Sequence, residues 1–179
     1  MRKIVAALMM SVDGVVEAPE KWTGPYFSPE LGQAVGSMMA AQDAMLLGRV
    51  TYDGFAAHWP QQVGEMADTM NGTAKYVVSG TLESADWQNA TLIRRDRAAA
   101  EITELKQRPG KNIGMTGSAT LVAWLLGERL LDELHLLVFP VVVGGGKRLF
   151  DGDASPAALT LAHFEAYGTG VVHLTYHAK

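Results

Sequence analysis

Three apolar segments of the chain are each followed directly by glycine and hydroxyl-bearing residues. The polar residues are Gly48-Arg49-Val50-Thr51 after Leu47, Ser79-Gly80-Thr81 after Val78, and Thr116-Gly117-Ser118-Ala119-Thr120 after Met115. Glycine lets backbone N–H groups approach an anion closely, and a helix that begins there adds partial positive charge. Because ligands of open α/β sheets bind beyond the carboxyl ends of the strands, the three segments together predict a site for an extended ligand with several phosphates.

Each of these segments also has an ordinary structural explanation. Gly117-Ser118 is typical of a strand-to-helix turn, Ser79-Gly80 of a tight turn, and Arg49 of a solvated surface arginine. Their occurrence together, in order along the chain, favours the binding site.

The elements that must position these residues alternate between strands and helices. Continuous apolar runs predict buried strands over 3–10, 43–47, 75–80, 91–94, 112–116 and 131–143, the last interrupted at Pro140. Apolar residues at helical spacing predict helices over 28–42, 51–57, 97–107 and 117–127, with a short helix or a loop over 64–71. Closing strands over 157–166 and 171–178 predict a hairpin. We therefore expect an α/β fold whose mainly parallel central sheet has an antiparallel C-terminal hairpin.

Length and composition exclude several classes of protein. The 179 residues are 48% hydrophobic and predict a single domain, 1–179. A formal net charge of −4 without a basic run argues against nucleic-acid and membrane partners. The chain has no cysteine, which excludes disulfides and thiolate nucleophiles, and its five histidines show no metal-ligand spacing, so no metal is expected. The apolar segment 1–11 is too short for a membrane span, and we expect a soluble cytoplasmic protein.

Gly144-Gly145-Gly146-Lys147 does not fit a phosphate-binding loop of nucleotide hydrolases. Such a loop needs Ser or Thr after the lysine, where Arg148 stands, and a first glycine at position 141, which is valine. The segment instead predicts a bulge or a tight loop near the substrate end of the site.

The chain resembles the dihydrofolate reductase superfamily. It is more closely similar to the branch that includes the reductase domain of bifunctional riboflavin-biosynthesis deaminase/reductases. The matching segments are Ile4 to Ser11 with Asp13-Gly14, Leu46 to Tyr52, Tyr76 to Ser79, Ile113 to Leu121, Asp132 to Leu136, and Pro140 to Phe150. The last segment is the most specific, since plain dihydrofolate reductases lack it. The resemblance implies a three-layer α/β/α fold of the dihydrofolate reductase type.

The resemblance also implies NADPH as the cofactor. Carried over by position, the Ala7 backbone meets the nicotinamide carboxamide, and Gly48, Arg49 and Thr51 hold phosphates. Ser79 and Thr81 lie near the adenosine 2′-phosphate, with Arg94 or Arg95 as a second cation. Thr116, Gly117, Ser118, Ala119 and Thr120 lie under the pyrophosphate. The family usually has two glycines at this turn, and serine at position 118 fits only if its φ is negative.

On the substrate side the candidate acids are Glu30, by position in the first turn of the first helix, and Asp13, after the first strand. Burial beside apolar walls is expected to raise the pKa of the acid toward neutrality. Glu30 also fits a carboxylate that complements the helix dipole, and Asp13 a turn residue. Six aromatic residues provide either a wall for a flat heterocycle or lid and core packing: Trp22, Tyr26, Phe27, Tyr52, Phe55 and Trp59.

We therefore expect an NADPH-dependent reductase of the riboflavin-biosynthesis type. Its hydride acceptor is a C=N or C=O bond in a small heterocyclic substrate that resembles a pterin, a pyrimidine or a flavin precursor. The alternative is a non-catalytic NADPH-binding redox sensor or interaction module. The long apolar block Leu130 to Val143 and the resemblance favour a homodimer.

Overall fold

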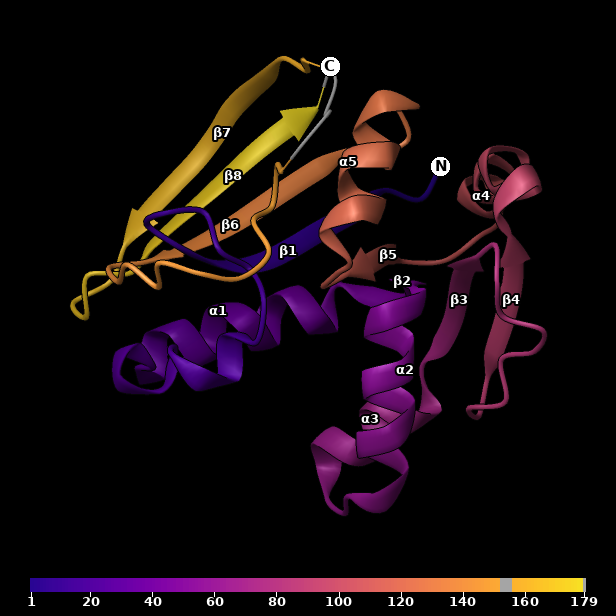
Figure 1. The fold of residues 1–179 in the computed structure, drawn as a ribbon, viewed down its shortest axis with the longest axis horizontal. Coiled ribbons are helices and arrows are strands. Elements are labelled where there is room, and N and C mark those ends of the chain that lie inside the picture. Colours follow the sequence, from indigo (N-terminus) through magenta and orange to yellow (C-terminus); the bar gives the residue numbers. More distant parts are fainter. Residues whose placement is uncertain (152–155, 179) are drawn as a thin grey trace.

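The computed structural model describes residues 1–151 and 156–178. These residues form one eight-stranded sheet with the order β4-β3-β2-β5-β1-β6-β8-β7 (Figure 1). The six strands from β4 to β6 run parallel, and β8 and β7 are antiparallel additions after β6. The strands are β1 (Ile4–Ser11), β2 (Gln42–Gly48), β3 (Ala74–Ser79), β4 (Ala90–Arg94), β5 (Asn112–Met115), β6 (Glu133–Phe139), β7 (Leu159–Ala166) and β8 (Val172–Ala178). The expected mainly parallel sheet with an antiparallel C-terminal hairpin is confirmed.

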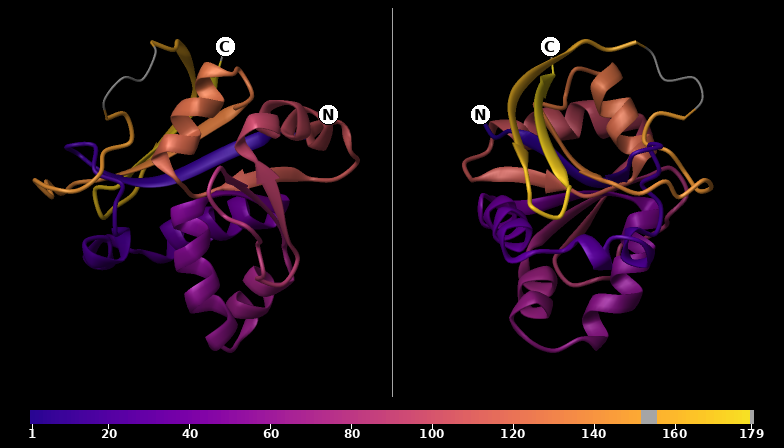
Figure 2. Two further views of the ribbon diagram at one scale, coloured as in Figure 1. Left: turned by 45° about the vertical axis from the view of Figure 1, so that its right-hand side comes forward. Right: turned by 90° about the vertical axis from the view of Figure 1, so that its left-hand side faces the viewer.

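Helices cover both faces of the sheet and make it the middle of three layers (Figure 2). Helices α4 (Ala98–Gln107) and α5 (Ala119–Gly127) pack on one face, in the largest cluster of buried apolar side chains. Helix α1 (Pro29–Ala40) packs on the other face through Leu31, which contacts Leu137 and Phe139 in the same buried cluster. Helices α2 (Arg49–His58) and α3 (Glu65–Gly72) lie on that second face, over β2 and β3.

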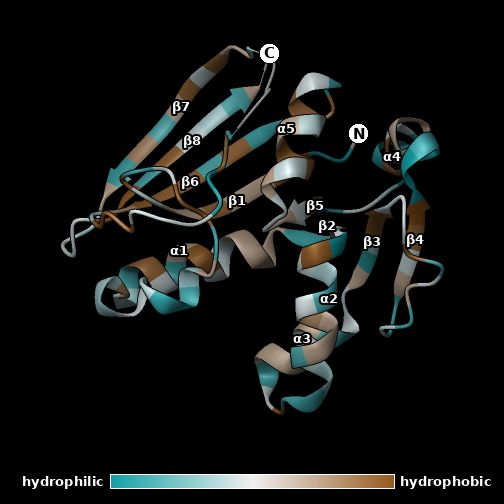
Figure 3. Ribbon diagram, viewed as in Figure 1, coloured by the Kyte–Doolittle hydropathy of each residue, from teal (hydrophilic) through white to brown (hydrophobic). Residues whose placement is uncertain are grey.

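The central strands carry mostly hydrophobic residues, whereas the helices combine hydrophobic and hydrophilic ones (Figure 3). Strands that are covered on both faces must be apolar at successive positions, which is why their runs are continuous rather than alternating. Residues 44–48 of β2 are all buried. This burial keeps the strands rigid and fixes where their carboxyl ends emerge.

The structure corrects several predicted bounds. The strand expected over 131–143 is β6, which ends at Phe139 because Pro140 has no N–H to donate to the ladder. The helix expected over 28–42 is α1, whose N-cap is Ser28; the Leu31 N–H donates to Ser28 Oγ over 3.2 Å. Residues 64–71 contain the helix α3 rather than a loop. Among residues 1–151 and 156–178, no helix has the length and hydrophobicity to cross a membrane.

Candidate active site

The turns that follow β2 and β5 pack directly against each other. A Cβ atom on Gly48, at the end of β2, would lie 2.5 Å from Ser118 Oγ, and one on Gly117 would lie 2.7 Å from Thr51 Oγ1. Both separations are shorter than real Cβ contacts, so a side chain at either position would have to displace the facing hydroxyl. The two predicted phosphate-binding segments therefore meet at one place.

Two helices begin at this contact. Helix α2 begins at Arg49, immediately after Gly48, and α5 begins at Ala119, immediately after Ser118. Ser118 is the N-cap of α5, and its hydroxyl accepts a hydrogen bond from the Leu121 N–H over 3.3 Å. Its φ of −87° is open to any residue, so serine fits where the family usually has a second glycine. The free N–H groups and positive dipole ends of both helices thus lie together, which suits an anion.

The third strand end, after β3, lies beside the first. Val78 is opposite Gly48 in the parallel ladder, and the next residue, Ser79, forms a turn. Ser79 Oγ accepts hydrogen bonds from the N–H groups of Thr81 and Leu82, over 3.1 and 3.0 Å. The predicted binding residues of this segment are therefore held in one compact turn.

Arg94 ends β4, the strand next to β3, and Arg95 follows it. The Arg94 guanidinium donates to the carbonyl oxygen of Leu82, and Ser79 is opposite Arg94 in the ladder. Arg95 packs near Gly80, where an added Cβ would lie 3.8 Å from Arg95 Cβ. Both cations therefore stand at the turn that follows β3, where the resemblance places the 2′-phosphate.

Arg49 lies in the first turn of α2 and is exposed. Its Nη1 is 3.2 Å from Asp53 Oδ2, one helical turn later, and both side chains are about half exposed. An exposed pair of this kind contributes at most about 1 kcal/mol, so an incoming phosphate can replace Asp53 at small cost.

Lys147 is a further cation beside the proposed diphosphate site, and the sequence patterns did not indicate it. Its Nζ donates to Thr120 Oγ1 over 2.7 Å, which places a second exposed cation on the first turn of α5. The one sequence signal for this lysine is the Gly-Gly-Gly-Lys segment, which does not fit a phosphate-binding loop. The segment from Pro140 to Arg148 instead lies alongside residues 12–16, and backbone hydrogen bonds such as Val16 N–H to Lys147 O, 2.9 Å, hold it there.

A cavity of about 260 Å³ lies between the sheet and helices α1, α2 and α3. Seven of the nine methionines of the chain line it, and we call it the methionine cavity. Its lining residues are Ala7, Met9, Val35, Met38, Met39, Gln42, Met45, Phe55, Trp59, Met66, Met70, Met115, Thr116 and Leu137. Ala7 is the predicted nicotinamide contact, and Thr116 immediately precedes Gly117. The cavity therefore adjoins the proposed cofactor turns.

Glu30 does not line the methionine cavity. Its side chain is exposed, whereas the next residue, Leu31, is fully buried against the sheet. A hydrogen bond from its own backbone N–H and one from the Ser28 hydroxyl lower its pKa. Successive helical residues point about 100° apart, so α1 turns Glu30 toward solvent when it buries Leu31. The expectation that burial raises the pKa of this acid is wrong.

Asp13 joins the end of β1 to the segment from Pro140 to Arg148. Its carboxylate accepts hydrogen bonds from the Ser11 hydroxyl and from the N–H groups of Val143 and Gly144, over 2.7, 3.0 and 2.9 Å. These bonds lower the pKa of Asp13 to about 2. The expectation of a raised pKa is wrong here too, because hydrogen-bond donors rather than apolar walls surround the carboxylate.

The six aromatic residues divide between packing and the cavity. Trp22, Tyr26 and Phe27 pack around Phe139, with ring centroids 5.7, 6.2 and 6.4 Å from it. Tyr52 is buried against Trp87. Only Phe55 and Trp59 line the methionine cavity, and their rings meet edge to face.

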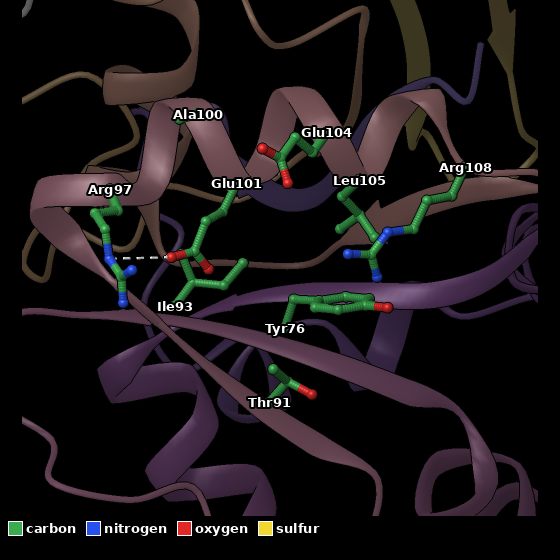
Figure 4. A pocket seen from close by; sticks show the side chains of 9 residues that line it. All are labelled: Tyr76, Thr91, Ile93, Arg97, Ala100, Glu101, Glu104, Leu105 and Arg108. Atoms are coloured by element: carbon green, nitrogen blue, oxygen red, sulfur yellow. Dashed lines mark ion pairs between the residues drawn. The ribbon is translucent and has the colours of Figure 1, made fainter.

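A second cavity, of about 500 Å³, lies on the opposite face of the sheet between α4 and strands β3 and β4. Figure 4 shows Tyr76 lying flat on the strands beneath charged α4 residues. Arg97 and Glu101 form an ion pair of 3.4 Å there, and Glu104 and Arg108 also line the cavity. No predicted site residue lines it, and its charges balance. We therefore place the candidate site at the methionine cavity and the three adjoining turns.

Comparisons with known proteins show the family and the fold of the chain. The family model of the RibD C-terminal domain matches residues 2–173. An uncharacterized Bacillus subtilis protein, YyaP, is 28% identical over 184 residues, which cover 98% of this chain and 95% of YyaP.

Two solved structures share the fold. The crystal structure of a putative riboflavin biosynthesis protein from Shewanella sp. PV-4 has a TM-score of 0.75 at 21% identity, with 100% of this chain and 99% of that chain covered. Dihydrofolate reductase from Enterococcus faecalis, complexed with NADP(H), has a TM-score of 0.63 at 14% identity, with 99% and 96% covered. The expected dihydrofolate reductase-like fold is confirmed.

Proposed function

We propose, since the chain belongs to the family of RibD C-terminal domains, that it is an NADPH-dependent reductase of a small ring compound. The observation that carries this proposal is the contact between Gly48 and Ser118, which brings two strand ends and two helix N-termini to one point. Such a point binds a diphosphate through backbone N–H groups.

The residues around this point fit NADPH. The N-termini of α2 and α5 receive the diphosphate, with Gly117, Ser118, Ala119 and Thr120 beneath it. Arg49, together with the turn that contains Ser79 and Thr81, receives the 2′-phosphate, because planar guanidinium donors suit a phosphate dianion. Ala7 directs the nicotinamide toward the methionine cavity. When bound, NADPH supplies a hydride from nicotinamide C4.

The methionine cavity holds the hydride acceptor, a C=O or C=N bond in a small heterocycle or related ring compound. Its apolar walls exclude bulk water from the reacting atoms, and the close approach of the two ligands supplies much of the catalysis. A pterin, a pyrimidine or a flavin precursor is the substrate that the family suggests.

A non-catalytic NADPH-binding sensor or interaction module is the second candidate. It is favoured by one observation: neither Glu30 nor Asp13 lines the methionine cavity. The two functions share the cofactor site and differ only in turnover.

Titration with NADPH and NADH, followed by quenching of tryptophan fluorescence and by calorimetry, tests the cofactor site. Single-turnover oxidation of bound NADPH by a panel of ring compounds then tests catalysis. We expect tight NADPH binding and oxidation by at least one compound. Binding without oxidation by any compound favours the sensor, and failure to bind NADPH refutes both functions.

We also propose that the protein is a homodimer. The apolar block Leu130 to Val143 does not support a homodimer, because its strand β6 lies inside the sheet. Most side chains of β6 are in the core of the same chain. Support comes from the edge strand β7, where Phe164 is 66% and Leu161 49% exposed. Light scattering of the intact protein and of Phe164→Lys tests this: the variant is expected to be a monomer, and a monomeric wild type contradicts the proposal.

A further inference from the structure

We infer that the methionine cavity takes an uncharged, largely apolar ring compound whose reducible group is a conjugated ketone, and that it rejects ligands with a phosphate or carboxylate. The inference rests on the proposed function for the source of hydride, and it replaces the C=O or C=N acceptor proposed there with the C=C bond of a conjugated ketone. Four features of the cavity support it.

The first feature is the absence of charge. None of the residues that line the methionine cavity, all within the described part of the chain, is acidic or basic. Its polar side chains are Gln42, Thr116 and the indole of Trp59. A phosphate or carboxylate that entered would lose hydration without meeting a cation, which is strongly unfavourable. The cations Arg49 and Lys147 lie instead at the helix N-termini proposed for the cofactor.

The second feature is the size and softness of the walls. A volume of about 260 Å³ is just below the range of about 300–1,000 Å³ that holds drug-sized ligands, so one or two rings fit. Methionine side chains are unbranched and polarisable, and they adapt to ligands of different outline and contact aromatic rings favourably. Phe55 and Trp59 provide a stiffer end, with ring centroids 6.4 Å apart. Such walls favour apolar ring compounds in general rather than a ligand of one particular shape.

The third feature is that neither candidate acid, Glu30 or Asp13, is among the described residues that line the cavity. A neutral C=N bond in a pterin or pyrimidine is a weak electrophile until its nitrogen is protonated, and this requires a positioned acid. Asp13, with its pKa lowered to about 2, is held by Ser11, Val143 and Gly144, and Glu30 faces solvent. A conjugated ketone needs no prior protonation.

The balanced reaction takes one hydride from a reduced nicotinamide and one proton from water. The hydride forms a C–H bond at the β-carbon, the C=C electron pair moves toward the oxygen, and the α-carbon then takes the proton. The products are the saturated ketone, the oxidised nicotinamide and hydroxide.

The fourth feature is a pair of hydrogen-bond donors for the ketone oxygen. The Gln42 carboxamide lies over Gly114 of β5, where an added Cβ would coincide with Gln42 Oε1 at 1.3 Å. Only glycine at position 114 leaves room for it. The amide N–H groups of Gln42 and the hydroxyl of Thr116 are the donors that the cavity offers to the negative charge that develops on the oxygen.

The test uses two probes of nearly the same size and shape: 4-phenylbut-3-en-2-one, a neutral conjugated ketone, and trans-cinnamate, in which a carboxylate oxygen replaces the methyl group of the ketone. Binding of each probe to the cofactor-free protein is measured by calorimetry, so the readout does not depend on turnover. The variant Met66→Lys adds a cation to the cavity at a position that is 49% exposed and therefore tolerant of charge. Val63→Lys adds the same charge nearby at a position that is 96% exposed and does not line the cavity.

We expect the wild type and Val63→Lys to bind the ketone at least about 10-fold more tightly than cinnamate. We expect Met66→Lys to lose this preference. Equal affinity for both probes, tighter cinnamate binding by the wild type, or no binding of the ketone overturns the inference. NADPH affinity, measured in the same samples, reports on the proposed function separately: its loss refutes the reductase, whether or not the ketone binds.

Discussion

Ser118 Oγ occupies the space that a side chain on Gly48 would need, since a Cβ there would lie 2.5 Å from it. Gly48 ends β2 and Ser118 caps α5, so this contact joins two strand ends that are 70 residues apart in the chain. The proposed diphosphate site depends on this separation staying short.

Gly48→Ala is therefore expected to push the two turns apart and weaken NADPH binding about 10-fold, or ~1.4 kcal/mol. The backbone itself permits alanine, since the φ of Gly48 is −78°. The double variant Gly48→Ala/Ser118→Gly removes the obstructing hydroxyl and is expected to recover part of the affinity. Gly54→Ala, where an added Cβ meets nothing within 4 Å, is the control. Calorimetry that gives Gly48→Ala the affinity of the wild type would refute the role of this contact.

Arg49→Ala is expected to weaken NADPH about 10- to 100-fold and NADH less than about 3-fold, because a charge-assisted bond to the 2′-phosphate is worth roughly 1.5–3 kcal/mol. Asp53→Ala frees the Arg49 guanidinium and should leave NADPH affinity equal or higher. Parallel titrations with the two coenzymes measure this. Equal losses for both would remove Arg49 from the 2′-phosphate site, although a role at the diphosphate would remain.

Lys75 is fully buried in β3, and its ammonium donates to the carbonyl oxygens of Asn71, Thr73 and Gln88 over 2.7, 2.8 and 2.9 Å. Lys75→Met leaves these three carbonyls without that donor and is expected to lower the free energy of unfolding by about 3 kcal/mol. Lys21→Met, on the surface, should change it by less than ~0.5 kcal/mol. Urea denaturation measures both, and equal stability of the two variants would contradict the account.

Burial lowers the pKa of Lys75 to about 8 from its ordinary 10.5. The unfolded chain then binds more protons than the folded chain between these values, so the stability is expected to rise as the pH increases from about 8 to 10.5. Lys75→Met should reduce this rise. A variant with the pH dependence of the wild type would show that Lys75 does not cause it.

His135 and His173 face each other across β6 and β8, with Nδ1 of His135 2.9 Å from Nε2 of His173. Burial lowers the pKa of both below 6.5, although Glu133 beside His135 and Glu165 beside His173 oppose this shift. Below pH 6.5 the unfolded chain takes up protons that the folded chain excludes. The free energy of unfolding should therefore decrease as the pH is lowered through this range.

Urea midpoints at about pH 7.5 and about pH 5 measure this loss. His173→Gln should reduce it, whereas His58→Gln, at an exposed position, should not. An equal loss in the two variants would contradict the role of the buried pair.

The order and type of most elements could be predicted from the sequence because both layers of helices bury the sheet. Continuous apolar runs such as Leu46-Leu47 and the Ser28-Pro29 start of α1 are local signals. The three strand ends could also be predicted, since glycine and hydroxyl residues stand directly after each run. Their contact could not, because it depends on β5 lying between β1 and β2.

Features that depend on tertiary packing could not be predicted from the sequence. Lys75 has the sequence appearance of a surface lysine, and only the carbonyls around it explain its burial. Lys147 reaches Thr120 because its loop folds back along residues 12–16. Glu30 fits an acid by position, but the rotation of α1 that buries Leu31 exposes it. The seven methionines of the cavity come from segments spread between residues 9 and 115, so no local pattern indicates that they meet.

A crystal structure of the protein soaked with NADPH tests the central claim most directly. The account predicts the diphosphate between residues 48–51 and 117–120, the 2′-phosphate beside Arg49, and the nicotinamide against Ala7 at the mouth of the methionine cavity. A coenzyme bound away from the β2 and β5 turns, or no bound coenzyme at saturating concentration, would contradict it.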